Sequence, residues 1–277
     1  MRIIFAGLVL LAMGLQAKAS ELLVKPLVVG ESLEVRSAHM QEQRRINVWL
    51  PAEYQQQTTT AFPVVYMLDG GVGEDFLHIA GLMQVSIANG TMRPFILVGI
   101  ENTVRRRDMT GPSENVLDKR DIPNLGGSAQ FRRFIAEELI PEITQRYRTT
   151  GERALVGESL AGLFTIETLV EAPDLFQSYV AIDPSLWWND MRLTQRFAEQ
   201  LKAQPRLEKH VYIASSSAPG MERAIKPFAD ILTLQKPEGL KWFYEHYSIE
   251  NHATIYHPAA LKAFRLLFAP ETKSTPK

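Results

Sequence analysis

The chain has 277 residues, of which 30 are basic and 31 acidic, and it contains no cysteine. Because the charges nearly cancel, the composition indicates no polyanionic partner, and we expect no nucleic-acid binding. The absence of cysteine excludes disulfides, thiolate metal sites, a lipoprotein anchor and a cysteine nucleophile in this chain. The length fits one large α/β domain or two small ones, and the apolar content is sufficient for a buried core.

The first residues have the pattern of a secretory signal peptide. Arg2 supplies a positive charge, residues 3–15 are apolar, and Ala17-Lys18-Ala19 offers a small-residue cleavage site before Ser20. The apolar run is too short for a comfortable transmembrane span, and no second such run follows. We therefore predict a signal peptide over residues 1–19, no stable membrane insertion and a periplasmic or secreted mature protein. An uncleaved membrane anchor is the alternative.

After this segment, a pair of strand patterns is followed by strands that alternate with helices. Residues 32–40 and 44–50 predict an antiparallel pair. Further strands are predicted at 63–68, 95–100, 154–156, 178–182, 210–214 and 241–248. Helical spacing predicts helices at 74–88, 131–148 (with a kink at Pro141), 160–171, 191–204, 221–235 and 258–268. A long polar loop is predicted at 101–127.

The order of these elements indicates the architecture. Strands that alternate with helices form a mostly parallel sheet with helices on both faces. We therefore predict a single α/β domain over residues 20–269, with an eight-stranded, mostly parallel sheet. Residues 270–277 are polar and are predicted to form a disordered tail.

The strongest functional signal lies between the strand at 154–156 and the helix that follows it. The sequence Gly157-Glu158-Ser159-Leu160-Ala161 is a near match to the G-x-S-x-G nucleophile elbow of α/β-hydrolases. Where a strand turns sharply into a helix, the residues two before and two after the serine must be small, because larger side chains would collide with the backbone. Ser159 is therefore the candidate nucleophile of an α/β-hydrolase fold. A serine that only caps the helix is the alternative.

In an α/β-hydrolase the acid and then the histidine follow the serine along the chain, each after a strand. His252 lies between the last predicted strand and the last helix, so it is the candidate general base, with His257 as the fallback. For the acid we prefer Glu222, which follows a strand after a loop of small residues. Asp183, at the end of the preceding strand, is the competing candidate, and Asp230 is a weaker one.

The remaining candidates concern substrate binding. Backbone N–H groups of Leu160 and Gly71 are the candidate donors of an oxyanion hole. Trp187 and Trp188 are candidates for an aromatic acyl pocket, and packing in the core or a lid explains them equally well. Arg107 lies in a run of three arginines that suits an anionic ligand, although acidic residues in the same loop offset the charge. We find no metal cluster and no cofactor motif, and no protein partner is implied.

Motifs along the chain resemble one family. They are PVVYMLDG at 63–70, VGIENT at 98–103, FIAEELIP at 134–141, GESLAGLF at 157–164 and DPSLWW at 183–188. Together they resemble the family of α/β-hydrolases called the putative esterases, which includes esterase D, enterobactin-type siderophore esterases, feruloyl esterases and mycolyltransferases. The resemblance spans about residues 32–268. It implies Ser159 as the nucleophile, His252 as the base and an acid in the region of Glu222.

Two positions depart from the family pattern. Glu158 stands where a histidine is usual, and Ala161 stands where a glycine is usual. Neither change removes a member of the triad. A carboxylate beside the nucleophile is expected to alter the pH dependence or to reject anionic substrates.

We therefore predict an exported serine esterase that hydrolyses a small-molecule carboxylic ester through an acyl-enzyme. Siderophore esters of the enterobactin type are preferred, because the DPSLWW segment favours that branch and an exported enzyme has no obvious use for a cytosolic glutathione thioester. One alternative is an acyltransferase that passes the acyl group to a sugar hydroxyl. The other is a non-catalytic binding protein on a hydrolase fold.

Overall fold

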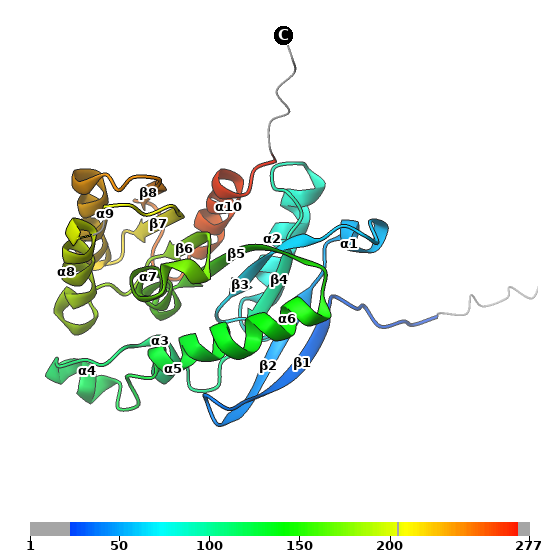
Figure 1. Ribbon diagram of the computed structural model, residues 1–277, viewed down its shortest axis with the longest axis horizontal. Coiled ribbons are helices and arrows are strands. Elements are labelled where there is room, and N and C mark those ends of the chain that lie inside the picture. The colour runs from blue at the N-terminus through cyan, green and yellow to red at the C-terminus, as the bar shows by residue number, and fades with distance from the viewer. Residues whose placement is uncertain (1–22, 204, 271–277) are drawn as a thin grey trace, which may run out of the picture.

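The polypeptide forms one sheet of eight strands, and the computed structural model describes residues 23–203 and 205–270 (Figure 1). The strands are β1 (Glu31–Ser37), β2 (Glu42–Trp49), β3 (Phe62–Met67), β4 (Ile96–Ile100), β5 (Thr149–Glu158), β6 (Ser178–Ile182), β7 (His210–Ser216) and β8 (Lys241–Tyr247). Their order across the sheet is β1-β2-β4-β3-β5-β6-β7-β8. The predicted signal peptide and residues 271–277 of the predicted tail lie outside the described residues.

The strands are mostly parallel. β1 is antiparallel to β2, and β2 is antiparallel to β4, whereas the pairs from β4 to β8 are all parallel. The predicted eight-stranded, mostly parallel sheet that begins with an antiparallel pair is therefore confirmed.

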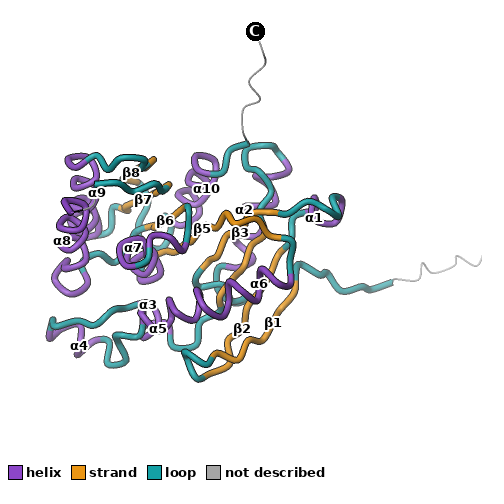
Figure 2. The backbone as a smooth tube through the Cα atoms, in the orientation of Figure 1, coloured by secondary structure: helices purple, strands orange, loops and turns teal. Residues whose placement is uncertain are grey.

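Helices cover both faces of this sheet. They are α1 (Ala52–Gln56), α2 (Phe76–Ala88), α3 (Arg105–Met109), α4 (Val116–Asp121), α5 (Ser128–Arg133), the π-helix η1 (Phe134–Leu139), α6 (Ile140–Arg146), α7 (Leu160–Glu171), the 3₁₀-helix η2 (Pro173–Leu175), α8 (Trp188–Ala203), α9 (Met221–Gln235) and α10 (Tyr256–Leu267). Figure 2 shows the strands crossing the middle of the molecule with helices on either side.

Each face of the sheet has its own apolar core, because successive side chains of a strand point to opposite faces. Val65 and Met67 of β3 pack with α2 and α10 on one face. Val64 and Tyr66 of the same strand pack with the helices from α5 to α9 on the other face. Burying one aliphatic side chain contributes about 1.5–3 kcal/mol, so both layers hold the sheet firmly.

The place where ligands bind follows from this topology. β3 and β5 are neighbours, but the helix after β3 (α2) and the helix after β5 (α7) lie on opposite faces. Between two such strands, the carboxyl ends form a crevice in which α/β proteins bind ligands. Residues 69–71 follow β3 and Ser159 follows β5, and the N–H of Leu68 still donates to Val156 O at 3.1 Å. The fold therefore directs both loops to one crevice.

Two helical segments differ from the sequence prediction. The helix expected at 131–148 with a kink at Pro141 is a run of α5, η1 and α6, in which the π-helical turn ends just before Ile140 and Pro141. A π-helix shifts the hydrogen-bond register, and Pro141 has no N–H to donate. In addition, α8 opens with Asn189, Asp190 and Met191 in a left-handed turn with φ values of 48°, 53° and 61°.

The polar segment predicted as a loop at 101–127 contains two short helices, and a buried ion cluster fixes the first of them. Arg44 of β2, whose side chain is 1% exposed, lies 2.6 Å from Asp108 of α3. Glu42 joins the cluster through Arg44 and Arg107. Burial alone raises the pKa of Glu42, but hydrogen bonds from Arg107, a threonine and Arg44 outweigh it and lower the pKa to about 2. The cluster therefore holds α3 against the sheet.

Candidate active site

Ser159 occupies a strained turn between β5 and α7. Its φ of 61° and ψ of −120° are unusual for a residue other than glycine, and such a conformation costs about 1–3 kcal/mol. Backbone hydrogen bonds hold it from both sides, because its N–H donates to Ile182 O at 3.0 Å and its carbonyl accepts from Ser185 N at 3.0 Å. The turn is thus part of the main-chain framework of β6 and the segment after it.

Gly157 is required at this turn because the chain passes close to itself. A Cβ atom at Gly157 would lie 2.5 Å from the carbonyl carbon and oxygen of Ala161 and 2.8 Å from its methyl group. No real side chain tolerates such distances without a shift of the backbone. The close approach of these two positions is what the G-x-S-x-G spacing anticipates.

The structure brings His252 to Ser159. His252 lies in the loop between β8 and α10, and its Nε2 is 3.0 Å from Ser159 Oγ. Its other ring nitrogen, Nδ1, is 2.6 Å from Asp183 Oδ2. The hydrogen bond with Asp183 raises the pKa of His252, desolvation acts in the opposite direction, and the charge of nearby Glu158 adds to the increase.

Asp183 is a buried carboxylate that receives several hydrogen bonds. It is 0% exposed and follows β6 with a φ of 45°, a left-handed conformation that aspartate tolerates better than most residues. Ser216 donates its N–H to Oδ1 and its hydroxyl to Oδ2, both at 2.7 Å. These donors compensate for the loss of water around the charge. They also fix the oxygen that faces His252.

The structure does not place Glu222, the preferred acid, beside His252. Glu222 lies in the first turn of α9, its side chain is 50% exposed, and its nearest histidine is His246, with Nε2 3.9 Å from Oε2. Gly220, with a φ of 86°, turns the chain into α9 so that Glu222 faces β8 and not the loop of His252. Asp183, the competing candidate, takes the place of Glu222 beside the imidazole.

The two weaker candidates are engaged elsewhere. Asp230 forms an ion pair with Lys226 at 2.7 Å on the exposed side of α9. His257 contacts His78 of α2, with 2.8 Å between the ring nitrogens. Neither residue joins the site around Ser159.

A second carboxylate also faces His252. Glu158, the residue before the nucleophile, places Oε1 3.5 Å from Nδ1 of His252. Burial raises the pKa of Glu158 to about 7, against the opposing charges of His252 and Arg105. Arg105 itself holds Asp69 through two hydrogen bonds of 2.6 and 2.8 Å. The pKa of Glu158 therefore lies close to the ordinary pKa of a histidine side chain.

The two expected oxyanion donors lie in different local settings. Leu160 is the first residue of α7, where N–H groups have no acceptor within the helix. The N–H of Gly71 instead donates to Oε2 of Glu74 at 2.7 Å, and Oε1 of Glu74 accepts from Asn102 at 2.8 Å. Gly71 can therefore bind an oxyanion only after Glu74 has moved away.

Of the three expected substrate-binding side chains, only Trp187 is well exposed. Trp187 is 44% exposed and lines a cavity of about 530 Å³ together with Arg223 and residues 219–221. Trp188 is 5% exposed and donates to Gly111 O at 3.2 Å. Arg107 is held by Asp108 and Glu42, and hence belongs to the ion cluster that anchors α3.

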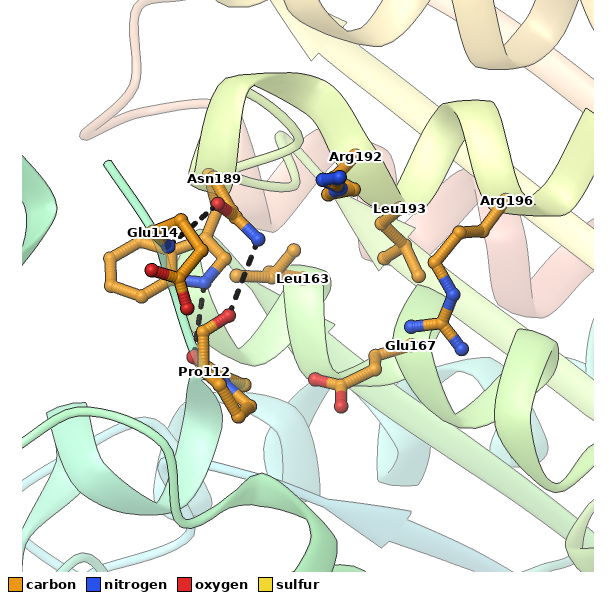
Figure 3. A pocket seen from close by; sticks show the side chains of 10 residues that line it. Pro112, Glu114, Leu163, Glu167, Asn189, Arg192, Leu193 and Arg196 are labelled. Atoms are coloured by element: carbon orange, nitrogen blue, oxygen red, sulfur yellow. Dashed lines mark hydrogen bonds between the residues drawn. The ribbon is translucent and has the colours of Figure 1, made fainter.

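A separate cavity of about 340 Å³ lies along α7 (Figure 3). Leu163 and Glu167 of α7 and Arg192 of α8 line it, and Trp188 contributes to the wall. Asn189 accepts a hydrogen bond from Glu114 N–H and donates one to Pro112 O, which ties the start of α8 to the loop at 112–114. Trp188 therefore lines a different cavity from Trp187, although the two are adjacent in the sequence.

Comparison with known proteins gives the context for this geometry. Residues 37–254 match the family described as "Putative esterase". The chain belongs to this family. Ferri-bacillibactin esterase BesA of Bacillus subtilis (strain 168) is 26% identical over 260 residues, which cover 83% of this chain and 87% of that protein. The predicted family and the predicted class of carboxylic-ester hydrolase are thereby confirmed.

Solved structures agree with the fold of this esterase. An IroE-like serine hydrolase from Shewanella oneidensis is 33% identical, with a TM-score of 0.79 over 86% of this chain and 80% of that chain. The BES protein from Bacillus cereus, at 23% identity, has a TM-score of 0.77 over 91% of this chain and 100% of that chain. Within residues 23–203 and 205–270 of the esterase, no helix is both long and apolar enough to cross a membrane.

The close approach at the elbow yields a stability prediction. We expect Gly157→Ala to lower the free energy of unfolding by about 1–3 kcal/mol, because the new methyl group forces the start of α7 away from β5. Gly151→Ala in the same strand is the matched control, since a Cβ atom there meets nothing within 4 Å. Urea denaturation followed by circular dichroism measures both. Equal losses in the two variants would contradict the steric explanation.

Proposed function

We propose that this esterase is an exported serine hydrolase of siderophore-type carboxylic esters. In this proposal Ser159 is the nucleophile, His252 is the general base and Asp183 is the acid. The observation that supports it best is the continuous chain of hydrogen bonds, in which both nitrogens of one imidazole are engaged, at 3.0 Å by Ser159 and at 2.6 Å by Asp183. A non-catalytic binding protein has no need for this arrangement, so we favour an enzyme.

The proposed reaction proceeds in two halves. Ser159 Oγ attacks the ester carbonyl carbon while Nε2 of His252 takes the hydroxyl proton, and the imidazolium then gives that proton to the leaving alcohol. The acyl group remains on Ser159 as an ester. A water molecule, deprotonated by His252, attacks this acyl-enzyme, and the imidazolium returns the proton to Ser159 Oγ as the carboxylic acid is released. Asp183 holds the ring orientation and stabilises its positive charge throughout.

The choice of siderophore esters has two supports. Relatives that align with this chain carry the names ferri-bacillibactin esterase and apo-salmochelin esterase. The cavity lined by Trp187 and Arg223, with Asp190 also in its wall, combines an exposed aromatic ring with a cationic group. This combination suits an aromatic ring that carries acidic hydroxyl groups, as in a catecholate. Ser216, the partner of Asp183, lines the adjoining hollow together with Arg223.

The substrate proposal is tested with a panel of esters. We expect a trilactone of catecholate-bearing residues to be cleaved with a kcat/KM about tenfold or more above that of p-nitrophenyl acetate, because only the former fills the aromatic and cationic cavity. Ser159→Ala should reduce both activities by about 10⁴-fold or more. Liquid chromatography identifies the products. Cleavage of the simple ester alone would reject the siderophore part, and transfer of the acyl group to an added sugar would favour an acyltransferase.

The identity of the acid is tested by a pair of substitutions. We expect Asp183→Asn to lower kcat by about 10⁴-fold, because an amide cannot stabilise the imidazolium and favours the wrong tautomer. Glu222→Ala should retain most of the activity, since Glu222 does not contact His252. Steady-state kinetics with p-nitrophenyl acetate compare the two variants. The reverse ranking would restore Glu222 as the acid.

Export is part of the same proposal and rests on the pattern of residues 1–19. When the full chain is expressed in a Gram-negative host, we expect the esterase in the periplasmic fraction with Ser20 as its first residue. Fractionation followed by mass spectrometry of the intact protein measures this. A chain that retains residues 1–19 and sediments with membranes would indicate an uncleaved anchor instead.

A further inference from the structure

Two carboxylates converge on the same nitrogen of His252. Asp183 Oδ2 lies 2.6 Å from Nδ1, and Glu158 Oε1 lies 3.5 Å from the same atom. A protonated Nδ1 has one hydrogen to donate, and the shorter distance assigns it to Asp183. Glu158 is therefore placed to act on the imidazole mainly through its charge.

The strand register explains why the two carboxylates meet. Glu158 is the last residue of β5 and pairs with Ile182, the last residue of β6. Asp183 follows Ile182 directly, so the two acids leave neighbouring strand ends one residue apart in register.

The surroundings of Glu158 leave its charge only partly compensated. Its side chain is 18% exposed, and the charged groups that face it are His252, Arg105, Asp69 and Asp183; the buried phenol of Tyr256 on α10 also lies within reach of its charge. Arg105 is committed to Asp69 by two short hydrogen bonds and reaches Glu158 only at the backbone carbonyl, at 3.5 Å. His252 is therefore the cation that an ionised Glu158 can stabilise most directly.

We propose that Glu158 is a positioning residue that makes the basicity of His252 depend on the protonation state of a second carboxylate. This inference rests on the proposed role of His252 as the general base. The two groups form a coupled pair in which one proton resides either on Glu158 or on the imidazole. Only the form with a neutral imidazole can accept the proton of Ser159. Ionised Glu158 stabilises the charged imidazole. The neutral imidazole therefore appears only at a higher pH.

The proposal predicts the shape of the pH profile. With Glu158 present, the acid limb of kcat/KM should extend over a wider pH range than the titration of one group, because two groups share the proton. In Glu158→Gln the limb should become a single ionisation and move to lower pH. One pH unit below the wild-type midpoint, we expect this variant to retain a roughly fivefold larger fraction of its plateau activity. The midpoint and slope of the limb, and not the height of the plateau, carry the test, since Asp183 still orients His252 in the variant.

The experiment compares wild type, Glu158→Gln and Glu222→Gln with an uncharged p-nitrophenyl ester over a range of pH. Glu222→Gln makes the same chemical change at an exposed site away from Ser159, so its profile should match that of wild type. A purely structural role of Glu158 would lower the plateau and leave the midpoint and slope unchanged. Superimposable profiles for wild type and Glu158→Gln would overturn the proposal.

A second measurement separates this inference from the proposed function. NMR titration of the His252 ring, assigned by its absence in His252→Gln, reports the imidazole directly and needs no turnover. We expect its midpoint to fall in Glu158→Gln and to stay unchanged in Glu222→Gln. The proposed function fails if ester hydrolysis is absent, or if it survives Ser159→Ala. The coupling still stands in that case if the NMR midpoint of His252 falls in Glu158→Gln. An unchanged NMR midpoint in Glu158→Gln rejects the coupling whatever the enzyme hydrolyses.

Discussion

The backbone turn at Ser159 is the constraint on which the rest of the site depends. A serine with a φ of 61° costs about 1–3 kcal/mol, and this strain persists only because neighbouring elements fix the chain on both sides. α7 is buried along almost its whole length, from Leu160 to Val170. At about 1.5–3 kcal/mol for each buried aliphatic side chain, its packing easily exceeds the cost of the turn. The helix thereby holds the hydroxyl in the crevice toward His252.

Electrostatic support for this crevice extends across the sheet. Asp183 is stabilised by Ser216 at the end of β7, and Asp69 after β3 is held by Arg105 from α3. The position of α3 in turn depends on the buried pair of Arg44 and Asp108. Removing one partner of such a buried pair leaves an uncompensated charge and typically costs about 3–5 kcal/mol. A side chain on β2 thus influences the charges that surround the imidazole.

Sequence patterns predicted the scaffold better than the site. The bounds of α7, β6 and α9 agree with apolar periodicity, which reports burial directly. The order of a serine elbow and a later loop histidine was sufficient to select Ser159 and His252, which the structure places in contact. Periodicity does not report single left-handed residues. Hence the left-handed turns at Asp183 and Gly220 were not predictable. The first brings Asp183 to the imidazole, and the second turns Glu222 away from it.

The same limit applies to the arginines at 105–107. Arg105 and Arg107 lie two residues apart on α3, a helix of five residues within a segment that reads as a polar loop. At about 100° per residue, two positions apart point to nearly opposite sides of a helix. Arg105 consequently reaches Asp69 beside the site, whereas Arg107 joins the ion cluster behind it. The different directions of Arg105 and Arg107 can be inferred from the sequence only when α3 is recognised as a helix.

Glu74 satisfies a backbone donor of the crevice. The N–H of Gly71 needs an acceptor, and Glu74 supplies a carboxylate oxygen at 2.7 Å. An ester carbonyl that becomes an oxyanion offers the same kind of acceptor, with negative charge on oxygen. Glu74 is exposed, so its carboxylate regains water when it leaves, although its hydrogen bond from Asn102 is then lost as well. For Gly71 to serve as the proposed oxyanion donor, Glu74 would have to leave before the tetrahedral intermediate forms, because its carboxylate occupies this N–H.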